Sequence, residues 1–451
     1  MQRSYSVAFS KPNGTFAGRY PALAHVPYIL DSRPGFHRLA NAYLVDRALG
    51  LWHPRTQPGQ PSSLIPSQQS VHNYAQWLVN FLEWADRRRV GLSTCSYAVH
   101  VQGRYQSEML EGTWARNGRP RKPNTVNVRV HQACEFLSWM VAYGHRGPFS
   151  IPYESVRLKL GSATSSVGHL SKEVNARKGK VRVEPRALRL PTDEQVGDWL
   201  GRVGAKAGDT SRLMCETILL TAMRREEVVC LRTDTLPENT QDWHIANPLE
   251  PAHRQQVRLT IKFGTKGRSF GMDHNDKIGP TRSILIPLLL AKKWDDYRRG
   301  LRNRAFKRFM EGTTGKEARR ELAASSVHLF LRDGDGERFS GKRLYDDWVA
   351  ADPPLDGWSP HQGRHWWACS VLWRELQRHE LAHRLGAGET AVALLESTAL
   401  SVIRLQIQPQ LGHANESTTM IYLRWVMDML GVPLSLIGDA SQPNGLKDIA
   451  Q

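Results

Sequence analysis

The sequence has no long apolar run and few cysteines. Its longest strongly apolar stretch, Ile284–Ala291, is far too short to cross a bilayer. The N-terminus lacks a basic segment followed by an apolar run, so we predict no secretory signal. The five cysteines are scattered and include no C-x-x-C pair, which argues against a disulfide framework and against a cysteine zinc site. These absences favour a soluble protein of a reducing cytoplasm.

Acidic residues are scarce relative to basic ones. The 451 residues include 61 Lys or Arg and 43 Asp or Glu, which gives a net charge of +18. This surplus indicates a polyanionic partner, because each phosphate that a protein neutralises releases a counterion. Nine basic residues but only two acids lie between Arg157 and Arg189, and a second basic cluster spans Lys292–Arg308. Double-stranded DNA is therefore the expected partner, and the alternative is a basic but otherwise ordinary enzyme.

Length and periodicity predict more than one domain. Two amphipathic helical patterns lie in the first half, one capped by Ser67 and one by Asn124 or Thr125, with a further helix expected between them. The predicted regions are an N-terminal extension (1–61), a helical domain (62–148), a basic interdomain linker (149–188), a second compact domain (189–435) and a polar tail (436–451). The extension has no assigned fold and is a candidate accessory DNA-binding piece.

The basic linker is low in large apolar residues, which predicts an extended tether between the two domains. A disordered surface loop is the alternative. Its candidate DNA contacts are Lys172, Arg177, Lys178, Lys180 and Arg182.

The second compact domain is expected to begin with a helix capped by Thr192 or Asp193. Alternating apolar residues then predict a strand at 257–263 and a partner strand at 282–287, joined by a long Gly-rich connection. The remaining pattern is helical to about residue 435.

Four short motifs in this domain carry chemically useful side chains. They read T-A-M-R-R-E-E from Thr221, T-K-G from Thr265, P-H-Q-G-R-H from Pro360, and L-G-H followed by a tyrosine nine residues after the histidine. The polar groups in chain order are Arg224, Lys266, His361, Arg364, His413 and Tyr422, with Glu227 three residues after the first.

This order of motifs resembles the tyrosine recombinases, also called the phage integrase family. The resemblance covers about residues 190–430, and more loosely 62–148, which looks like the family's core-binding domain. Ala222 stands where the family usually has glycine. Lys266 is the least secure match, because Lys262, Arg268 and Lys277 are alternatives in the same long hairpin.

The resemblance implies a mainly α-helical protein with a small antiparallel β-sheet, whose two domains form a C-shaped clamp around DNA. It implies a site-specific recombinase that works through a 3′-phosphotyrosyl intermediate and a Holliday junction, as a homotetramer on two DNA sites. The polar tail is a candidate for docking on a neighbouring protomer. Accessory recombination proteins, a mobile genetic element and a bacterial, nucleoid-associated location are also expected.

Chemistry explains the residue types. Arg224 and Arg364 each present a planar fork of donors to the non-bridging oxygens of a phosphodiester. Tyr422 is the expected nucleophile, and His361 is the candidate that accepts its proton or hydrogen-bonds the phosphate. His413 is expected to donate to a phosphate oxygen, and Lys266 to protonate the departing 5′ oxygen. Glu227 is expected to orient its neighbours, and no metal or other cofactor is expected.

Two other readings use the same residues: a type IB topoisomerase that relaxes DNA, and a DNA-binding regulator that no longer cuts. A third comes from H-E-x-x-H at His379–His383, within a segment (377–401) that looks like an insertion. Two histidines at this spacing share a helix face and suit zinc, but Glu389 stands at the position of the third metzincin ligand. We therefore expect a solvated helix there rather than a metal site.

Overall fold

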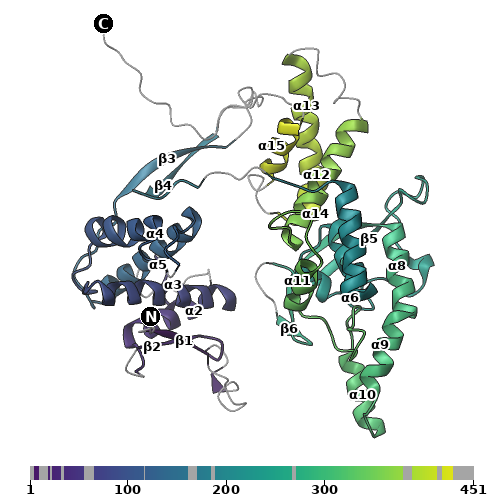
Figure 1. The fold of residues 1–451 in the computed structure, drawn as a ribbon, viewed down its shortest axis with the longest axis horizontal. Coiled ribbons are helices and arrows are strands. Elements are labelled where there is room, and N and C mark those ends of the chain that lie inside the picture. The colour runs from purple at the N-terminus through teal and green to yellow at the C-terminus, as the bar shows by residue number, and fades with distance from the viewer. Residues whose placement is uncertain are drawn as a thin grey trace. The chain divides into compact units, whose positions relative to one another are not determined.

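The computed structural model describes residues 5–9, 19–20, 23–31, 35–54, 65–115, 117–160, 170–183, 188–266, 271–378, 389–413 and 419–429. The chain divides into two compact units, one of residues 1–161 with 165–185 and one of residues 162–164 with 186–451. Helices dominate both units, and the strands form small antiparallel sheets (Figure 1). This confirms the predicted fold class; the clamp around DNA stays a prediction.

In the described part of the first unit there are five helical segments and two antiparallel strand pairs. Its elements are β1 (Ser6–Ala8), β2 (Tyr28–Leu30), α2 (Arg38–Leu49), α3 (Gln68–Arg87), the π-helix η1 (Tyr97–Gln106), α4 (Ser107–Glu111), α5 (Pro123–Ala142), β3 (Tyr153–Leu160) and β4 (Leu170–Arg177). The predicted N-cap Ser67 is observed, with its hydroxyl accepting from the backbone N–H of Ser70. Helix α5 begins earlier than expected, because Pro123 occupies its first turn and needs no N–H partner there.

Part of the N-terminal extension packs into the helical unit. Helix α2 joins the same core as α3 and α5. Its Tyr43 hydroxyl accepts from Gln132 at 2.6 Å, and its Asp46 carboxylate accepts from the Trp139 indole at 2.8 Å. No fold was predicted for this region because its apolar residues are scattered among prolines and follow no clear period.

The region expected to be an extended linker contains a hairpin instead. Strands β3 and β4 pair antiparallel, from Tyr153 opposite Arg177 to Leu160 opposite Leu170. The segment after β4 is bound to the helices: Tyr97 donates to the carbonyl of Lys178, and Gln106 to that of Gly179. Side-chain partners for these backbone groups hold the segment on the first unit.

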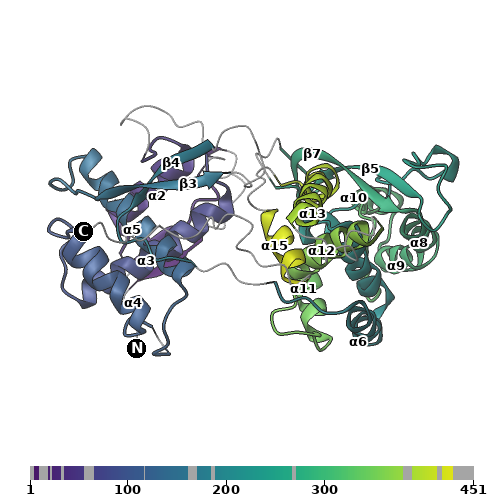
Figure 2. The ribbon, with the colours of Figure 1, turned by 90° about the horizontal axis from the view of Figure 1, so that it is seen from above.

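The second unit carries a three-stranded antiparallel sheet of order β5-β7-β6. Its elements are α6 (Asp193–Thr221), α7 (Arg225–Val229), η2 (Thr240–Asp242), β5 (Gln256–Phe263), β6 (Gly271–Asp273), β7 (Asp276–Pro287), α8 (Leu288–Arg299), α9 (Leu301–Met310), α10 (Lys316–Ser325), α11 (Gly341–Ala350), α12 (Pro360–Arg378), α13 (Glu389–Val402), η3 (Ile403–Ile407), α14 (Gln408–Leu411) and α15 (Met420–Met429). Thr192 caps α6, as expected. Figure 2 shows β5 and β7 side by side.

The strands extend further than the sequence pattern suggested. The long connection between them holds β6 and the first half of β7, joined by a turn in which His274 and Asn275 have positive φ. A two-residue turn of this kind suits the twist of an antiparallel pair. The Gly-rich composition hid these short strands.

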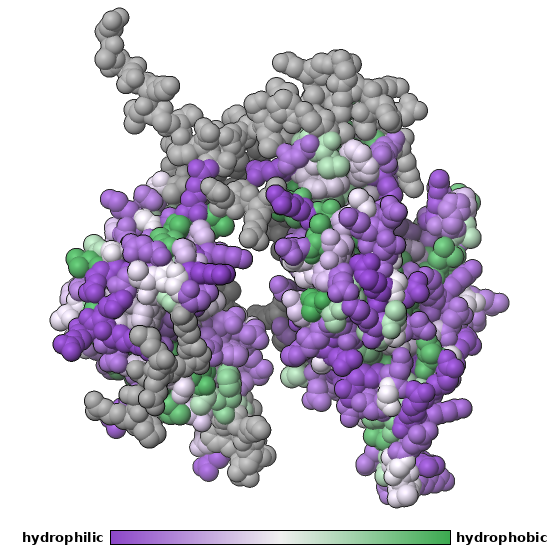
Figure 3. All heavy atoms as spheres, viewed as in Figure 1, coloured by the Kyte–Doolittle hydropathy of each residue, from purple (hydrophilic) through white to green (hydrophobic). Residues whose placement is uncertain are grey.

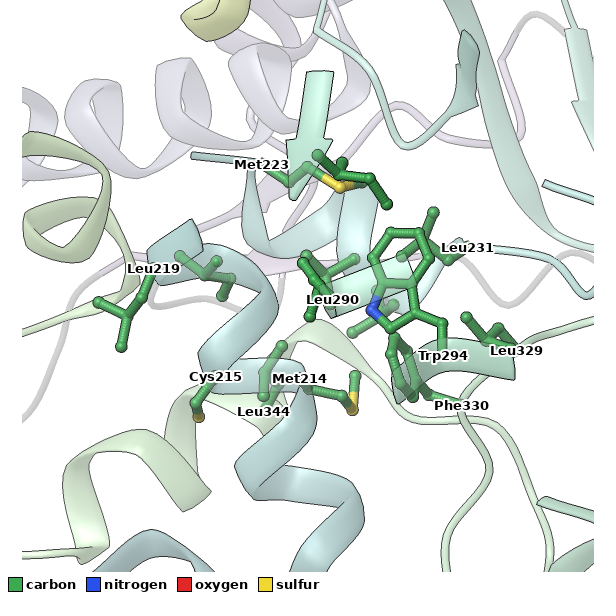
Figure 4. Packing of buried hydrophobic residues seen from close by; sticks show 14 of the residues in the cluster. Met214, Cys215, Leu219, Met223, Leu231, Leu290, Trp294, Leu329, Phe330 and Leu344 are labelled. Carbon is green, nitrogen blue, oxygen red and sulfur yellow. The ribbon is translucent and has the colours of Figure 1, made fainter. Parts of the chain in front are cut away.

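Two apolar clusters support the second unit. The larger joins α6, α8, α11 and the sheet, with the Trp294 indole donating to the Thr217 hydroxyl at 3.0 Å (Figure 4). The smaller joins α12, α13 and α15. Hydrophilic residues predominate on the face of this unit seen in Figure 3.

Two sequence features lie outside the described residues. They are the segment 379–388, which contains the whole H-E-x-x-H pattern, and the polar tail 436–451. Within the described ranges, no helix has both the length and the apolar character that a membrane span needs.

Candidate active site

The end of α6 places Arg224 at the centre of the site. Ala222 closes the helix in the left-handed conformation, with φ of 53°. This conformation suits glycine best, which explains the glycine usual in the motif that Ala222 replaces. Arg224 follows in an extended conformation and precedes the short helix α7.

Glu227, in α7, is fully buried and binds two arginines. Its carboxylate accepts from the backbone N–H and the Nη1 of Arg224, at 2.7 and 2.8 Å. It also accepts from the Nε and Nη2 of Arg282, at 3.0 and 2.6 Å. Burial alone raises the pKa of Glu227, but the hydrogen bonds and charges of Arg282 and then Arg224 hold it below its usual value. Glu227 is therefore an anionic brace for two guanidinium groups, as expected of a supporting residue.

Arg282 belongs to none of the four sequence motifs. This residue lies in β7, far from Glu227 in the sequence, and its guanidinium also donates to the carbonyl of Gln410. Nothing in the pattern R-S-I-L-I-P separates it from an ordinary outward-facing strand arginine. Its only mark in the sequence is its position in the strand predicted at 282–287, which is the expected partner of the strand that precedes Lys266.

Gln410 joins three segments of the site through its amide. Its Nε2 donates to the carbonyls of Thr221 and Leu285, both at 2.8 Å, and its Oε1 accepts from the Leu285 N–H at 2.9 Å. The end of α6, the strand β7 and the helix α14 are thereby held together. This amide fixes the position of the L-G-H motif that follows.

Gly412 is required by both conformation and space. It ends α14 with φ of 61°, and a Cβ built there lies 3.1 Å from the Cδ of Arg282. Its carbonyl and that of Leu411 both accept from the Nη2 of Arg224, at 3.0 Å. The glycine of L-G-H thus lets the backbone approach the arginine pair.

Arg364 is buried in the first turns of α12, with 5% of its surface exposed. It donates to the carbonyl of Ala222, and at 2.9 Å to the same Leu411 carbonyl that Arg224 binds. Burial, reinforced by the charge of Arg224, lowers the pKa of Arg364 to about 9. At neutral pH it is still charged, so two guanidinium groups converge on one backbone oxygen.

Two histidines flank these arginines. Partial burial lowers the pKa of His361, and the charges of Arg364, Lys266 and Arg224 act in the same direction. Burial and the same two arginines lower the pKa of His413 to about 4. The Nδ1 of His413 is buried and has no hydrogen-bond partner among the described residues. Both rings are neutral near pH 7, so each can offer one donor and one acceptor.

Tyr422, in α15, is buried, with 1% of its surface exposed. Its hydroxyl lies 3.0 Å from the Nδ1 of His365, whose ring stacks edgewise on that of His361. Burial raises the pKa of Tyr422, and Arg364 opposes the rise. The sequence analysis gave His365 no role, although the H-x-x-R-H motif contains it. The hydroxyl is thus within hydrogen-bond distance of His365, whereas His361 was the expected proton acceptor.

Lys266 is exposed in the loop after β5. Gly264 places this loop against α7, because its φ is 69° and a Cβ there lies 2.4 Å from the Glu226 carbonyl. The charge of Lys266 acts on His361, which puts the lysine within electrostatic reach of the histidines. Of the alternatives, Lys262 lies in β5 and Lys277 in β7, and Arg268 lies outside the described residues.

The candidate DNA contacts of the basic segment divide into two groups. Arg177 is buried, and its guanidinium donates to Tyr97 and, at 3.1 Å, to Gln106. It therefore supports the first unit rather than offering a free charge. Lys178, Lys180 and Arg182 are exposed, and Lys172 lies in β4.

The second unit thus collects a strongly cationic set of groups around a tyrosine. Charge of this kind stabilises a five-coordinate phosphorus, because guanidinium forks match non-bridging oxygens. Within the residues that the structure describes, no three His, Cys, Asp or Glu side chains form a group fit to hold a metal. The set suits phosphoryl transfer by side chains.

Comparison with known proteins gave structural matches only; no family model and no curated protein matches the chain. A XerH site-specific recombinase bound to palindromic difH substrate matches at 14% identity and a TM-score of 0.44, over 81% of this chain and 78% of that one. The Tn1549 transposon integrase in complex with circular intermediate DNA matches at 11% and 0.42, over 82% and 94%. A XerA recombinase matches at 13% and 0.30, over 81% and 92%.

Identities and TM-scores this low leave the function to be inferred from the residues of the site. These matches cover about four fifths of the chain.

Proposed function

We propose that this protein is a tyrosine-type site-specific DNA recombinase. The observation that carries the proposal is the meeting of Arg224, Arg364, His413 and the His365–Tyr422 pair, which come from three separate stretches of sequence. A purely structural tyrosine needs no such cationic surroundings.

The reaction follows from the chemistry of these groups. The Tyr422 oxygen attacks a DNA phosphorus and forms a phosphotyrosyl ester, while the bond from phosphorus to the 5′ oxygen breaks. The phenol proton passes to a neutral imidazole, for which His365 is placed at 3.0 Å. Lys266 gives a proton to the departing 5′ oxygen. Reversal by the 5′ hydroxyl of another strand reseals DNA without ATP, because the ester retains the energy of the broken bond.

The arginines supply the electrostatic part of catalysis. Arg224 and Arg364 stabilise charge on the non-bridging oxygens, and Glu227 with Arg282 holds Arg224 in place. Losing one preorganised donor costs on the order of a hundredfold in rate. Since Tyr422 is buried, attack also requires a movement that brings its hydroxyl and a DNA phosphate together.

The family resemblance supports a homotetramer that pairs two DNA sites and exchanges strands through a Holliday junction. A type IB topoisomerase uses the same chemistry on one duplex. Exchange between two differently labelled duplexes separates these readings, because a topoisomerase joins no strand from one duplex to the other. A regulator that no longer cuts retains binding without cleavage.

The decisive experiment uses DNA fragments enriched by repeated band-shift selection with the full-length protein. A nick just 3′ of the cleavage point in the enriched duplex lets the short fragment that carries the freed 5′ hydroxyl diffuse away, which traps the covalent intermediate. Wild type is expected to give a protein–DNA adduct on denaturing gels, and Tyr422→Phe none, while both shift the duplex. EDTA is expected to leave the adduct unchanged.

An adduct that persists in Tyr422→Phe moves the nucleophile to another residue. Binding without any adduct in the wild type supports the regulator. Tyr345→Phe, which changes a tyrosine on the exposed side of α11, is the matched control and is expected to cut normally.

A further inference from the structure

The helical unit contains a pocket that takes no part in strand cleavage. It has a volume of about 500 Å³ and lies between α3, residues 113–121 and α5. This size falls within the range of small-ligand pockets, roughly 300–1,000 Å³. Its lining includes four arginines and two tryptophans: Arg87, Arg88, Arg121, Arg129, Trp77 and Trp114.

Two of these arginines are already neutralised. Arg87 pairs with Glu83 at 2.7 Å and lies over the Trp114 ring. Arg88 pairs with Glu108 at 2.9 Å. Glu83 and Glu108 are therefore already paired, and the other two arginines leave the pocket with a positive charge.

The other two arginines have no carboxylate partner within the described ranges. Arg129 donates to the neutral amide oxygen of Asn80 at 3.2 Å, and the Nε atoms of both Arg121 and Arg129 are buried without a hydrogen-bond partner. Burial lowers the pKa of Arg129, and the charge of Arg121 acts in the same direction. Two guanidinium groups that repel each other in a partly dehydrated pocket are stabilised by an anion.

The aromatic wall of the pocket is held in place. The Trp114 indole and the Tyr105 hydroxyl both donate to the Asn80 amide oxygen, at 3.3 and 2.8 Å. Asn80 therefore fixes Trp114 and Arg129 together. A cation pair beside flat apolar surface matches a ligand that carries a phosphate next to a sugar or base.

We propose that this pocket binds one nucleotide unit, with its phosphate on Arg121 and Arg129 and its sugar or base against Trp77 and Trp114. The phosphate belongs either to a DNA strand or to a free nucleotide, and the chemistry of recognition is the same. The proposed site belongs to the first unit, whereas Tyr422 belongs to the second, and nucleotide binding there does not require cleavage.

The test compares two double variants of the full-length protein. Arg121→Gln with Arg129→Gln removes the pocket charges. Arg89→Gln with Arg119→Gln removes two exposed charges nearby, outside the pocket lining, and is the matched control. Calorimetry with deoxyadenosine monophosphate and with inorganic phosphate probes the free ligand. Fluorescence anisotropy with single-stranded and duplex oligonucleotides over a range of salt probes DNA.

If the pocket binds a free nucleotide, calorimetry gives saturable heat with the wild type and the control variant, and at least tenfold weaker binding with the pocket variant. A DNA source predicts no such heat, and a slope of log K against log salt that is shallower by about 1 in the pocket variant than in the control. Equal behaviour of the two double variants in both assays overturns the proposal. Arg121→Gln alone replaces the pair if the double variant does not fold. The Tyr422 adduct is scored in parallel, so failure of the recombinase assignment shows as a missing adduct in the wild type.

Discussion

Glu227→Gln tests whether the buried carboxylate organises the arginine pair. Gln keeps the shape of the side chain and removes its charge, so Arg224 and Arg282 lose their shared anion. Breaking a buried ion pair costs about 3–5 kcal/mol, and Gln still accepts one hydrogen bond, so we expect about 3 kcal/mol. For a unit of this size that lowers the melting temperature by roughly 6–12 °C.

The contribution of Glu227 to stability depends on pH, in a direction set by its lowered pKa. Because the pKa of Glu227 is lower in the folded protein than in the unfolded chain, its contribution is complete above the unfolded value of about 4.3. It is lost as the pH falls through the folded value. The melting temperatures of wild type and Glu227→Gln are therefore expected to differ fully at pH 7 and to converge below pH 4.

The matched control is Glu226→Gln. This neighbour is half exposed and pairs only with Arg225 within the described residues, so its loss is expected to cost less than about 0.5 kcal/mol. Thermal unfolding followed by circular dichroism measures both variants. A melting temperature for Glu227→Gln no lower than that of Glu226→Gln at pH 7 refutes the bracing role.

Three further outcomes are expected. Gly412→Ala adds backbone strain of about 1–2 kcal/mol and its Cβ presses on the side chain of Arg282, so we expect lower stability and loss of cleavage. Gly144→Ala carries the same backbone strain but meets no neighbouring atom, so we expect it to leave cleavage intact. The pKa of His365, lowered by burial to about 4, means that the unfolded chain binds its proton more readily, so acidification from pH 6.5 to 4.5 destabilises wild type more than His365→Asn in thermal unfolding. Arg177→Gln lowers the free energy of unfolding by about 2 kcal/mol and leaves the salt slope of DNA binding unchanged. Lys180→Gln leaves the free energy of unfolding unchanged and makes the salt slope shallower.

The sequence predicted the features that depend on short local patterns, namely periodic helices, an alternating strand and closely spaced motifs. The apolar period located α3 and α5, the alternation at 257–263 located β5, and the motif spacing selected Arg224, Arg364 and Tyr422. The structure brings the two arginines to one carbonyl and puts Tyr422 against the neighbouring histidine.

What the sequence could not show depends on contacts between distant segments. Arg282 meets Glu227 only because β7 packs against α6, and α7 follows α6 in the chain. Arg177 looks like a linker charge in a basic stretch, and only the position of Tyr97 and Gln106 reveals that it is buried. The hairpin β3–β4 was missed because the segment as a whole is basic and low in large apolar residues, so the short alternation at Val156, Leu158 and Leu160 was not read as a strand.

The shared Leu411 carbonyl has a consequence for substrate binding. In the free protein this single oxygen serves as an internal substitute for an anion, which spares two neighbouring cations from facing each other unscreened. In the proposed function, a DNA phosphate therefore binds by replacing the Leu411 carbonyl as the acceptor for the guanidinium groups of Arg224 and Arg364. In the proposed function, part of the binding energy of that phosphate is therefore used to release the backbone at Leu411, two residues before His413.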